Sequence, residues 1–291
     1  MSTRCIMCGC SAPFAELFTK EGYKIAACRE CSLVQLEPTP SAEALEALYS
    51  EHYFNAAEAE SGYTDYASQE TEYLATFAED VRAIQQHVPT GRVLDVGCGY
   101  GYFLKAAEKA GFEPYGIDLS DAAVEQANAR FRGRVFSGTL DNSGLPADLK
   151  FDVVFASHVI EHITEPVEFI RQAAARLRPG GLLVLVTPNI ESVLARVSKA
   201  RWVSFKIPEH VAYYSPKTIR ALILRGGNFD VLGVSPAYQH YRLPFVATKL
   251  RQLAKPLDRL VPELENTRWL RDRIIRVTSG SLRVVARKGG G

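Results

Sequence analysis

Short apolar runs alternate with amphipathic segments through the middle of this 291-residue chain. Residues 93–96 and 113–117 are apolar and partly β-branched, which favours buried parallel strands. Residues 102–110 between them have helical spacing, and Gly111 ends the helix. Further strands are predicted at residues 134–136, 151–156, 182–187, 229–234 and 281–287. Strands that alternate with helices in this way predict an α/β fold with a doubly wound sheet.

The chain divides around this alternating region. Residues 1–40 are expected to form a small unit, residues 41–90 a helical linker and substrate-side cap, and residues 91–237 the core. Residues 238–276 are basic and partly amphipathic, which predicts a helical insertion, and residues 277–291 hold the last core strand and a tail. The insertion is expected to pack in the core or an oligomer, with a substrate lid or peripheral membrane contact as the alternatives.

A glycine-rich turn follows the first strand of the core. The strand leads into the segment Gly97-Cys98-Gly99-Tyr100-Gly101, and the second strand ends in Asp118. Glycine lets a backbone approach a ligand closely, and a carboxylate can accept hydrogen bonds from two ribose hydroxyls. Asp95 near the end of the first strand would repel a pyrophosphate but suits a cationic amino-acid group. Together they predict a nucleotide-sized crevice at the carboxyl edge of the sheet.

This stretch resembles motif I of the class I S-adenosylmethionine (SAM) methyltransferases. The resemblance implies a Rossmann-like doubly wound core with SAM in the crevice, and another Rossmann-like nucleotide binder is the alternative. The residues that it places at the cofactor are Asp95, Gly97, Gly99, Gly101, Tyr102, Asp118, Leu119, Thr139, Leu140 and Ser157.

Two cysteine pairs lie near the N-terminus. Cys5-x-x-Cys8 and Cys28-x-x-Cys31 are separated by 19 residues, and two such turns can complete a tetrahedral zinc site. Four cysteine ligands leave no open position, so the predicted zinc is structural. Cys10 is a further thiol that could compete with Cys8. We therefore expect a small N-terminal zinc ribbon with four cysteine ligands.

One histidine constellation directly follows the strand at residues 151–156. It reads Ser157-His158-Val-Ile-Glu161-His162, and an inverted zinc-protease motif is disfavoured because that motif lies within a helix. Glu161-His162 resembles a pair in ubiquinone-type O-methyltransferases that is associated with a divalent cation, although this chain has His158 where those enzymes tend to have an acid. The resemblance makes His158, Glu161 and His162 catalytic candidates. Hydrogen-bonded bracing of the loop is the alternative.

A second constellation lies in an irregular segment after the strand at residues 182–187. Pro208-Glu209-His210 and the following residues to Ser215 resemble a stretch of nucleotide-sugar C-methyltransferases, which also join a cysteine zinc module to this core. Glu209 and His210 correspond to their glutamate–histidine pair, although Pro208 replaces a first histidine. Histidine has a suitable pKa for a general base. His210 is the first candidate base and His158 the second, with Glu209 in support.

Aromatic residues supply the candidates for substrate contact. The stretch from residue 49 to residue 66 is rich in tyrosine, and Tyr53 and Tyr66 could line a substrate wall together with Tyr213. Ordinary half-buried packing is the alternative.

The net charge of +1 conceals a strong gradient. Residues 1–90 hold 5 Lys/Arg and 14 Asp/Glu, whereas residues 192–291 hold 19 and 6. The acidic balance of the third of the chain that bears the ribbon disfavours a nucleic-acid partner, because a zinc module that grips RNA should be basic. The chain shows no apolar signal core and no run of about 18 apolar residues, so a cytoplasmic location is expected.

These features predict a SAM-dependent methyltransferase that acts on a small molecule. The acceptor is expected to be sugar-like or a secondary metabolite from natural product biosynthesis, and O- and C-methylation remain open. An rRNA or tRNA base methyltransferase, and a non-catalytic zinc-ribbon interaction protein, are the alternatives. The oligomeric state is open.

Overall fold

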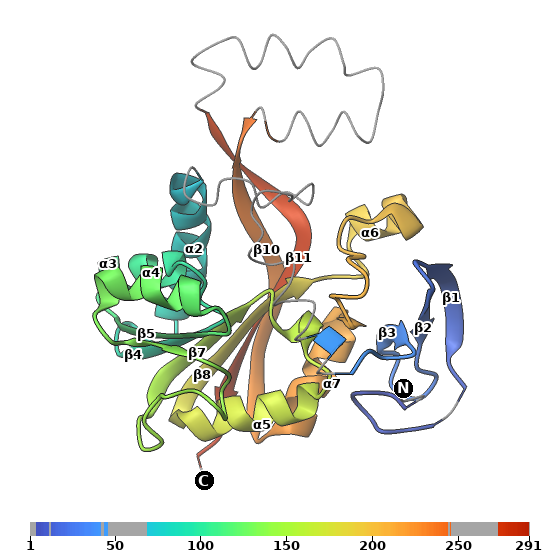
Figure 1. Ribbon diagram of the computed structural model, residues 1–291, viewed down its shortest axis with the longest axis horizontal. Coiled ribbons are helices and arrows are strands. Elements are labelled where there is room, and N and C mark those ends of the chain that lie inside the picture. Colours follow the sequence, from blue (N-terminus) through green and yellow to red (C-terminus); the bar gives the residue numbers. More distant parts are fainter. Residues whose placement is uncertain are drawn as a thin grey trace.

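The computed structural model describes residues 4–11, 13–41, 44–45, 69–243, 245 and 273–290. Two β-sheets, the larger one flanked by helices, make up this part of the chain (Figure 1). Tyr53, Tyr66 and most of the segment 238–276 lie outside the described residues.

The larger sheet has seven strands in the order β10-β11-β8-β7-β4-β5-β6. Neighbours from β8 to β6 are parallel, and β11 runs antiparallel between β8 and β10. The strands are β4 (Arg92–Val96), β5 (Glu113–Asp118), β6 (Val135–Ser137), β7 (Phe151–Ser157), β8 (Leu177–Pro188), β10 (Phe229–Arg242) and β11 (Ile274–Lys288). The doubly wound α/β prediction is confirmed. The strand order reverses at β4, where open α/β sheets bind their ligands.

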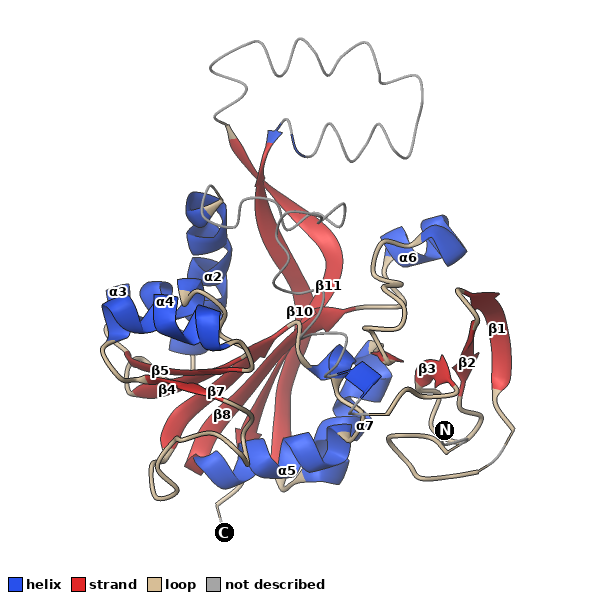
Figure 2. Cartoon of the chain, in the orientation of Figure 1, coloured by secondary structure: helices blue, strands red, loops and turns tan. Residues whose placement is uncertain are grey.

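Helices cover both faces of this sheet (Figure 2). On one face lie α2 (Glu70–Gln85), α3 (Tyr102–Lys109) and α4 (Asp121–Phe131), and on the other lie α5 (Pro166–Arg176) and α7 (Pro216–Gly226). Val153 and Val184 belong to the core of the first face, and Val154 and Leu185 to that of the second. These strands read as continuous apolar runs because both faces are covered. Each such buried side chain stabilises the fold by about 1.5–3 kcal/mol.

The smaller sheet joins the N-terminal segment to a distant part of the chain. Its antiparallel order is β1-β2-β3-β9, where β1 is Ala15–Lys20, β2 is Tyr23–Ala27, β3 is Val34–Glu37 and β9 is Ala212–Tyr213. Val34 pairs with Tyr213, and the Leu36 amide donates to the Val211 carbonyl at 3.0 Å. The irregular segment before β9 holds the short helices α6 (Val193–Ser198) and η2 (Lys199–Arg201). The N-terminal unit is therefore fastened to the segment that carries His210.

The structure differs from the predicted helical insertion at both of its ends. Residues 238–242 continue β10 and residues 274–276 begin β11, so that the two strands form a long ribbon beyond the sheet (Figure 1). Arg242 pairs with Ile274 and Tyr241 with Ile275 in this ribbon. Aromatic and β-branched residues fit such an antiparallel pair, and this preference outweighs the amphipathic pattern here.

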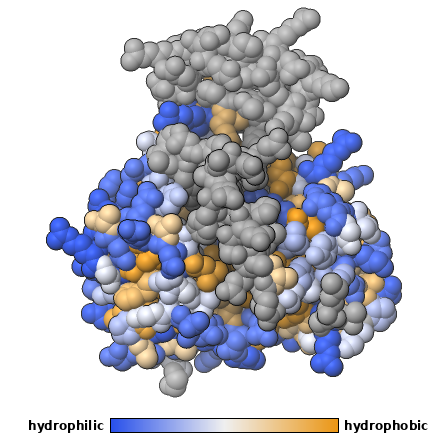
Figure 3. All heavy atoms as spheres, in the orientation of Figure 1, coloured by the Kyte–Doolittle hydropathy of each residue, from blue (hydrophilic) through white to orange (hydrophobic). Residues whose placement is uncertain are grey.

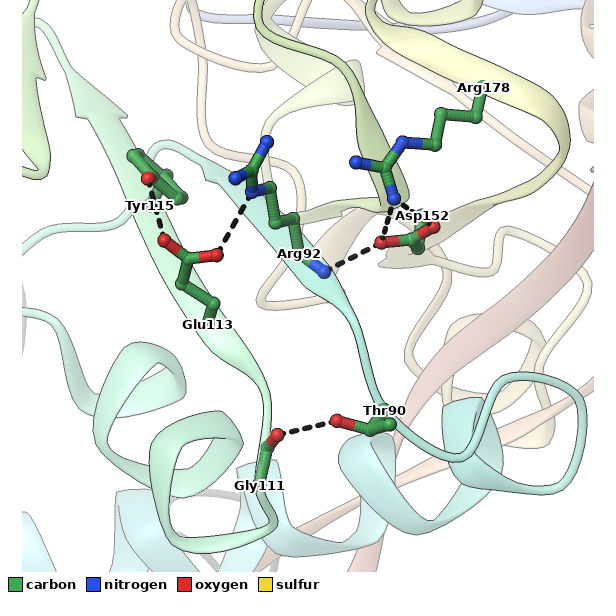
Figure 4. A network of polar contacts seen from close by, with 7 residues as sticks. All are labelled: Thr90, Arg92, Gly111, Glu113, Tyr115, Asp152 and Arg178. Carbon is green, nitrogen blue, oxygen red and sulfur yellow. Dashed lines mark hydrogen bonds and ion pairs between the residues drawn. The ribbon is translucent and has the colours of Figure 1, made fainter.

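Polar contacts join the amino-terminal ends of four strands at the edge opposite to the glycine turn (Figure 4). Asp152 of β7 accepts a hydrogen bond from the Arg92 amide at 2.7 Å. It also forms an ion pair with Arg178 at 2.7 Å. The Arg92 side chain contacts Glu113 of β5 at 2.9 Å. This network links β4, β5, β7 and β8, and no sequence motif indicated it.

Hydrophilic and intermediate side chains cover most of the described surface that is visible in Figure 3. Some large apolar side chains are exposed nonetheless. They include Leu119, which is 62% exposed, and Val193, Val197 and Val203 of the segment around α6. None of the described helices is long and apolar enough to cross a membrane.

Candidate functional site

Three glycines after β4 form a turn in the backbone region that glycine adopts most readily. Gly97, Gly99 and Gly101 have φ values of 74°, 50° and 78°, in the left-handed region. A Cβ on Gly97 would lie 2.7 Å from Val159 Cγ2, and one on Gly101 would lie 2.9 Å from Phe131 Cε2. The turn is thus packed tightly between β4, α4 and the segment that follows β7.

Asp118 at the end of β5 holds this turn from the other side. The Gly99 amide donates to Asp118 Oδ2 at 2.7 Å, and the Ser120 amide donates to Oδ1 at 2.9 Å. Burial raises the pKa of Asp118, and the two backbone hydrogen bonds oppose that shift. Each carboxylate oxygen keeps a second lone pair for a ligand hydroxyl. Leu119 beside it is 62% exposed, so an exposed apolar side chain lies next to Asp118 in the chain.

The other predicted cofactor residues differ in their access to the crevice. Asp95 is 3% exposed, and burial raises its pKa together with the nearby charges of Asp118 and Asp80. Tyr102 is 5% exposed and its ring stacks on that of Tyr73. Thr139 is exposed and donates to Asp141 at 2.5 Å, whereas Leu140 packs in the hydrophobic core. The Leu140 side chain is therefore buried in the core and only 3% exposed.

The end of β7 places a histidine–glutamate pair beside the glycine turn. His158, directly after Ser157, has φ 56°, and its Nδ1 lies 3.0 Å from Glu161 Oε1 in the short helix η1 (Ile160–His162). Thr187 donates to Glu161 Oε2 at 3.0 Å. Burial alone would raise the pKa of Glu161, which is 1% exposed, but the neighbouring imidazoles outweigh burial and lower that pKa to about 2. Glu161 is therefore an ionised acceptor for His158.

The structure brings the two histidine constellations together. His162 Nδ1 lies 3.0 Å from the Glu209 carbonyl, and the His162 and His210 rings meet edge to face with centroids 4.6 Å apart. His210 is 5% exposed, and its Nδ1 is buried with no hydrogen-bond partner among the described residues. Burial, together with the nearby His162, lowers the pKa of His210 to about 3. Glu209 enters this cluster through its backbone carbonyl.

The same cluster has the dimensions of a cation site. Ligand atoms of Glu161, His162 and His210 lie within 4.8 Å of one another. Both oxygens of Glu161 already accept hydrogen bonds from His158 and Thr187, so the cluster is also self-consistent as a hydrogen-bonded brace. Both interpretations that the sequence leaves open are compatible with this geometry.

Tyr213 lies in the contact between the smaller sheet and the segment after β8. It is 1% exposed, and its ring centroid lies 4.8 Å from that of Phe205 and 6.4 Å from that of Trp202. The pairing of β9 with β3 buries this side chain, which explains why the structure does not place it on an open substrate wall.

The four predicted zinc ligands converge. Cys5 Sγ lies 3.4 Å from Cys31 Sγ, Cys8 Sγ lies 3.7 Å from Cys28 Sγ, and all four sulfurs lie within 4.8 Å of one another. Zinc–sulfur bonds of about 2.3 Å in a tetrahedron space the sulfurs by about 3.8 Å, so the donor set fits zinc. Cys10 Sγ is also 3.3 Å from the sulfurs of Cys8 and Cys28. A hydrogen bond from Cys31 lowers the pKa of Cys5 to about 5, which favours a thiolate ligand.

Comparisons with known proteins find methyltransferases among the similar sequences. The chain is 29% identical over 157 residues to a ubiquinone biosynthesis O-methyltransferase of Caulobacter sp. (strain K31), across 49% of this chain and 60% of that relative. It is 37% identical over 110 residues to a tRNA U34 carboxymethyltransferase of Idiomarina loihiensis, across 34% and 33% of the two chains. The match to the first relative thus spans less than two thirds of that protein's own length.

Solved structures share the fold. The YcgJ protein of Bacillus subtilis superposes with a TM-score of 0.50 at 18% identity, over 75% of this chain and 99% of that one. The family model described as a methyltransferase domain matches residues 66–233, which is more than half of the chain. The strand order, the glycine turn and this match together establish that the chain belongs to the methyltransferase-domain family of class I SAM-dependent methyltransferases.

Proposed function

We propose that this enzyme transfers the methyl group of SAM to an oxygen or an acidic carbon of a small molecule, with a histidine as general base. The observation that carries the proposal is the position of His158 and Glu161 beside the glycine turn, with Val159 packed on Gly97. A base at this point borders the crevice in which a methyl donor would lie.

The crevice residues fit SAM. Asp118 would accept hydrogen bonds from the ribose hydroxyls, Leu119 would cover the adenine, and Asp95 would face the cationic amino group. When bound, SAM supplies an electrophilic methyl carbon on a sulfonium leaving group. The protein's task is then to align the acceptor with that carbon and to remove the acceptor's proton.

His158 is the better placed base. Its side chain is 36% exposed, whereas His210 is 5% exposed and the pKa of His210 lies near 3. The ionised Glu161 holds the proton of His158 on Nδ1, so that Nε2 can take the proton of the acceptor. The sequence-based order of candidates, with His210 first, is thus reversed in this proposal, and His210 and His162 brace the pair.

The N-terminal cysteines are proposed to hold a structural zinc through Cys5, Cys8, Cys28 and Cys31. No coordination position stays open in such a site, so the metal takes no part in the reaction. The acceptor is proposed to be sugar-like or a secondary metabolite, because residues 208–215 resemble nucleotide-sugar C-methyltransferases. We place the reaction in the cytoplasm.

The base is tested by comparing His158→Gln with His210→Gln. Removal of a general base lowers kcat by about 100- to 10,000-fold, so His158→Gln should show such a loss at an unchanged affinity for S-adenosylhomocysteine. His210→Gln should lose less activity than His158→Gln, because it acts only by destabilising the cluster of Glu161, His162 and His210. Methyl transfer is measured by mass spectrometry over a panel of hydroxylated small molecules, and binding by calorimetry. Equal activity of His158→Gln and the wild type would remove His158 from the mechanism.

A further inference from the structure

The ribbon formed by β10 and β11 reaches the candidate base. Gln239 of β10 places its Nε2 atom 3.4 Å from Nε2 of His158, and the Tyr241 hydroxyl donates to Gln239 Oε1. Gln239 follows a bulge in β10, where the pairing with β11 shifts between Ala237 and Gln239. Such bulges redirect a side chain out of the regular alternation.

The orientation of this amide follows from its neighbours. The Glu161 carboxylate lies 3.0 Å from His158 Nδ1 and accepts its hydrogen bond, so Nε2 of His158 carries the lone pair. A group that contacts this lone pair must donate, and the NH2 group of Gln239 does so while its oxygen accepts from Tyr241. At 3.4 Å the contact is longer than the usual 2.9–3.0 Å, which makes it weak and easy to displace.

We propose that Gln239 is a positioning residue that occupies the base in the acceptor-free enzyme and recognises the acceptor when it binds. The acceptor's reacting hydroxyl takes the place of the amide at Nε2 of His158. The displaced amide then donates to a second oxygen of the same molecule. This proposal rests on the proposed function and narrows the substrate class.

The chemistry of the amide sets that class. Because the oxygen of Gln239 already accepts from Tyr241 and the NH2 group faces His158, the NH2 group is the part of the side chain presented to the acceptor. Its partner must therefore be an oxygen next to the reacting hydroxyl, as in a vicinal diol, a catechol or a hydroxyl beside a carbonyl. An acceptor with a single isolated hydroxyl lacks this oxygen.

The test compares Gln239→Leu, Gln239→Glu and the matched control Gln126→Leu, which lies on the exposed face of α4. Loss of one neutral hydrogen bond should raise KM for a diol acceptor by about 3- to 10-fold in Gln239→Leu, with kcat within about 3-fold of the wild type. Gln239→Glu should lower kcat instead, because a carboxylate there bonds the protonated imidazole and holds it in the inactive form. Gln126→Leu should change neither constant. Calorimetric binding of S-adenosylhomocysteine verifies that each variant is folded.

A second readout does not require turnover. In protein labelled with ¹⁵N-histidine and bound to S-adenosylhomocysteine, the Nε2 resonance of His158 should move downfield in Gln239→Leu, as the lone pair loses its donor. His158→Gln assigns the resonance. An unmoved resonance, an unchanged KM, or equal rates on single alcohols and on diols would overturn the proposal. If the wild type methylates no small molecule while the resonance still moves, the proposed function fails although the contact is real.

Discussion

At the scale of single residues, the site depends on groups whose state is set by burial. Asp95 is 3% exposed and lies near the carboxylates of Asp118 and Asp80, which together with burial raise its pKa well above the ordinary value. A raised pKa means that the ligand-free protein keeps a proton on Asp95 at a pH where a free carboxylate would be ionised. A cationic ligand group beside Asp95 favours the ionised carboxylate instead and lowers its pKa again.

Cofactor binding should therefore release a proton. Because the amino group of the ligand favours the ionised form of Asp95, the affinity for S-adenosylhomocysteine should rise as the pH increases through the raised pKa. Asp95→Asn should lose this pH dependence and bind about 10-fold more weakly or worse, since a charged hydrogen bond is lost. Calorimetry in buffers of different ionisation enthalpy measures the released proton. Identical proton release by the wild type and Asp95→Asn would contradict the assignment.

The glycine turn gives a second prediction with an internal control. Gly97 and Gly99 both have positive φ, but a Cβ would clash with Val159 only at Gly97 and would meet nothing within 4 Å at Gly99. Gly99→Ala should cost about 1–2 kcal/mol of backbone strain. Gly97→Ala should cost about 1–3 kcal/mol more and should displace the residues around His158. Urea denaturation measures the free energy of unfolding of both variants. Equal losses would show that the Val159 side chain moves aside at no cost.

At the scale of elements, the smaller sheet braces the site. The Leu36 amide of β3 donates to the Val211 carbonyl, and the Val211 amide donates to the Glu161 carbonyl at 2.9 Å. A continuous chain of backbone contacts thus runs from the cysteine unit to the glutamate that orients His158. Sequence patterns could not reveal this link, because the pairing of β3 with β9 joins segments about 180 residues apart, and period-2 patterns specify no partner. The burial of Tyr213 was missed for the same reason.

Loss of the zinc should therefore act at a distance. Native mass spectrometry should find one zinc in the wild type and in Cys10→Ala, and none in the double variant Cys10→Ala/Cys28→Ala, in which Cys10 cannot replace the lost ligand. This double variant should lose most of its methyl transfer, while its affinity for S-adenosylhomocysteine stays within about 3-fold, because the glycine turn is held by Asp118 and packs on Val159, outside the cysteine unit. Full activity of zinc-free protein would show that the brace is dispensable.

At the scale of the whole molecule, the parts predicted well were those with local signals. The alternation of strands and helices, the glycine turn with Asp118 and the cysteine pairs were predicted because each has a characteristic spacing. The contact of Gln239 with His158 had no such signal. It arises because β10 continues past the sheet where a helix was predicted, so that residues 81 positions apart meet. Tertiary pairing overrode the local pattern in that segment.

The central claim concerns what the enzyme methylates, and one experiment tests it directly. Purified protein and methyl-labelled SAM are incubated in two parallel sets of reactions. One set contains diols, catechols or nucleotide-linked sugars, and the other contains tRNA or rRNA transcripts. Mass spectrometry then shows which molecules carry the label. The account predicts label in at least one small molecule with the wild type, a loss of about 100-fold or more in His158→Gln, and none in RNA. Label in RNA and in no small molecule would contradict it and would identify an RNA methyltransferase.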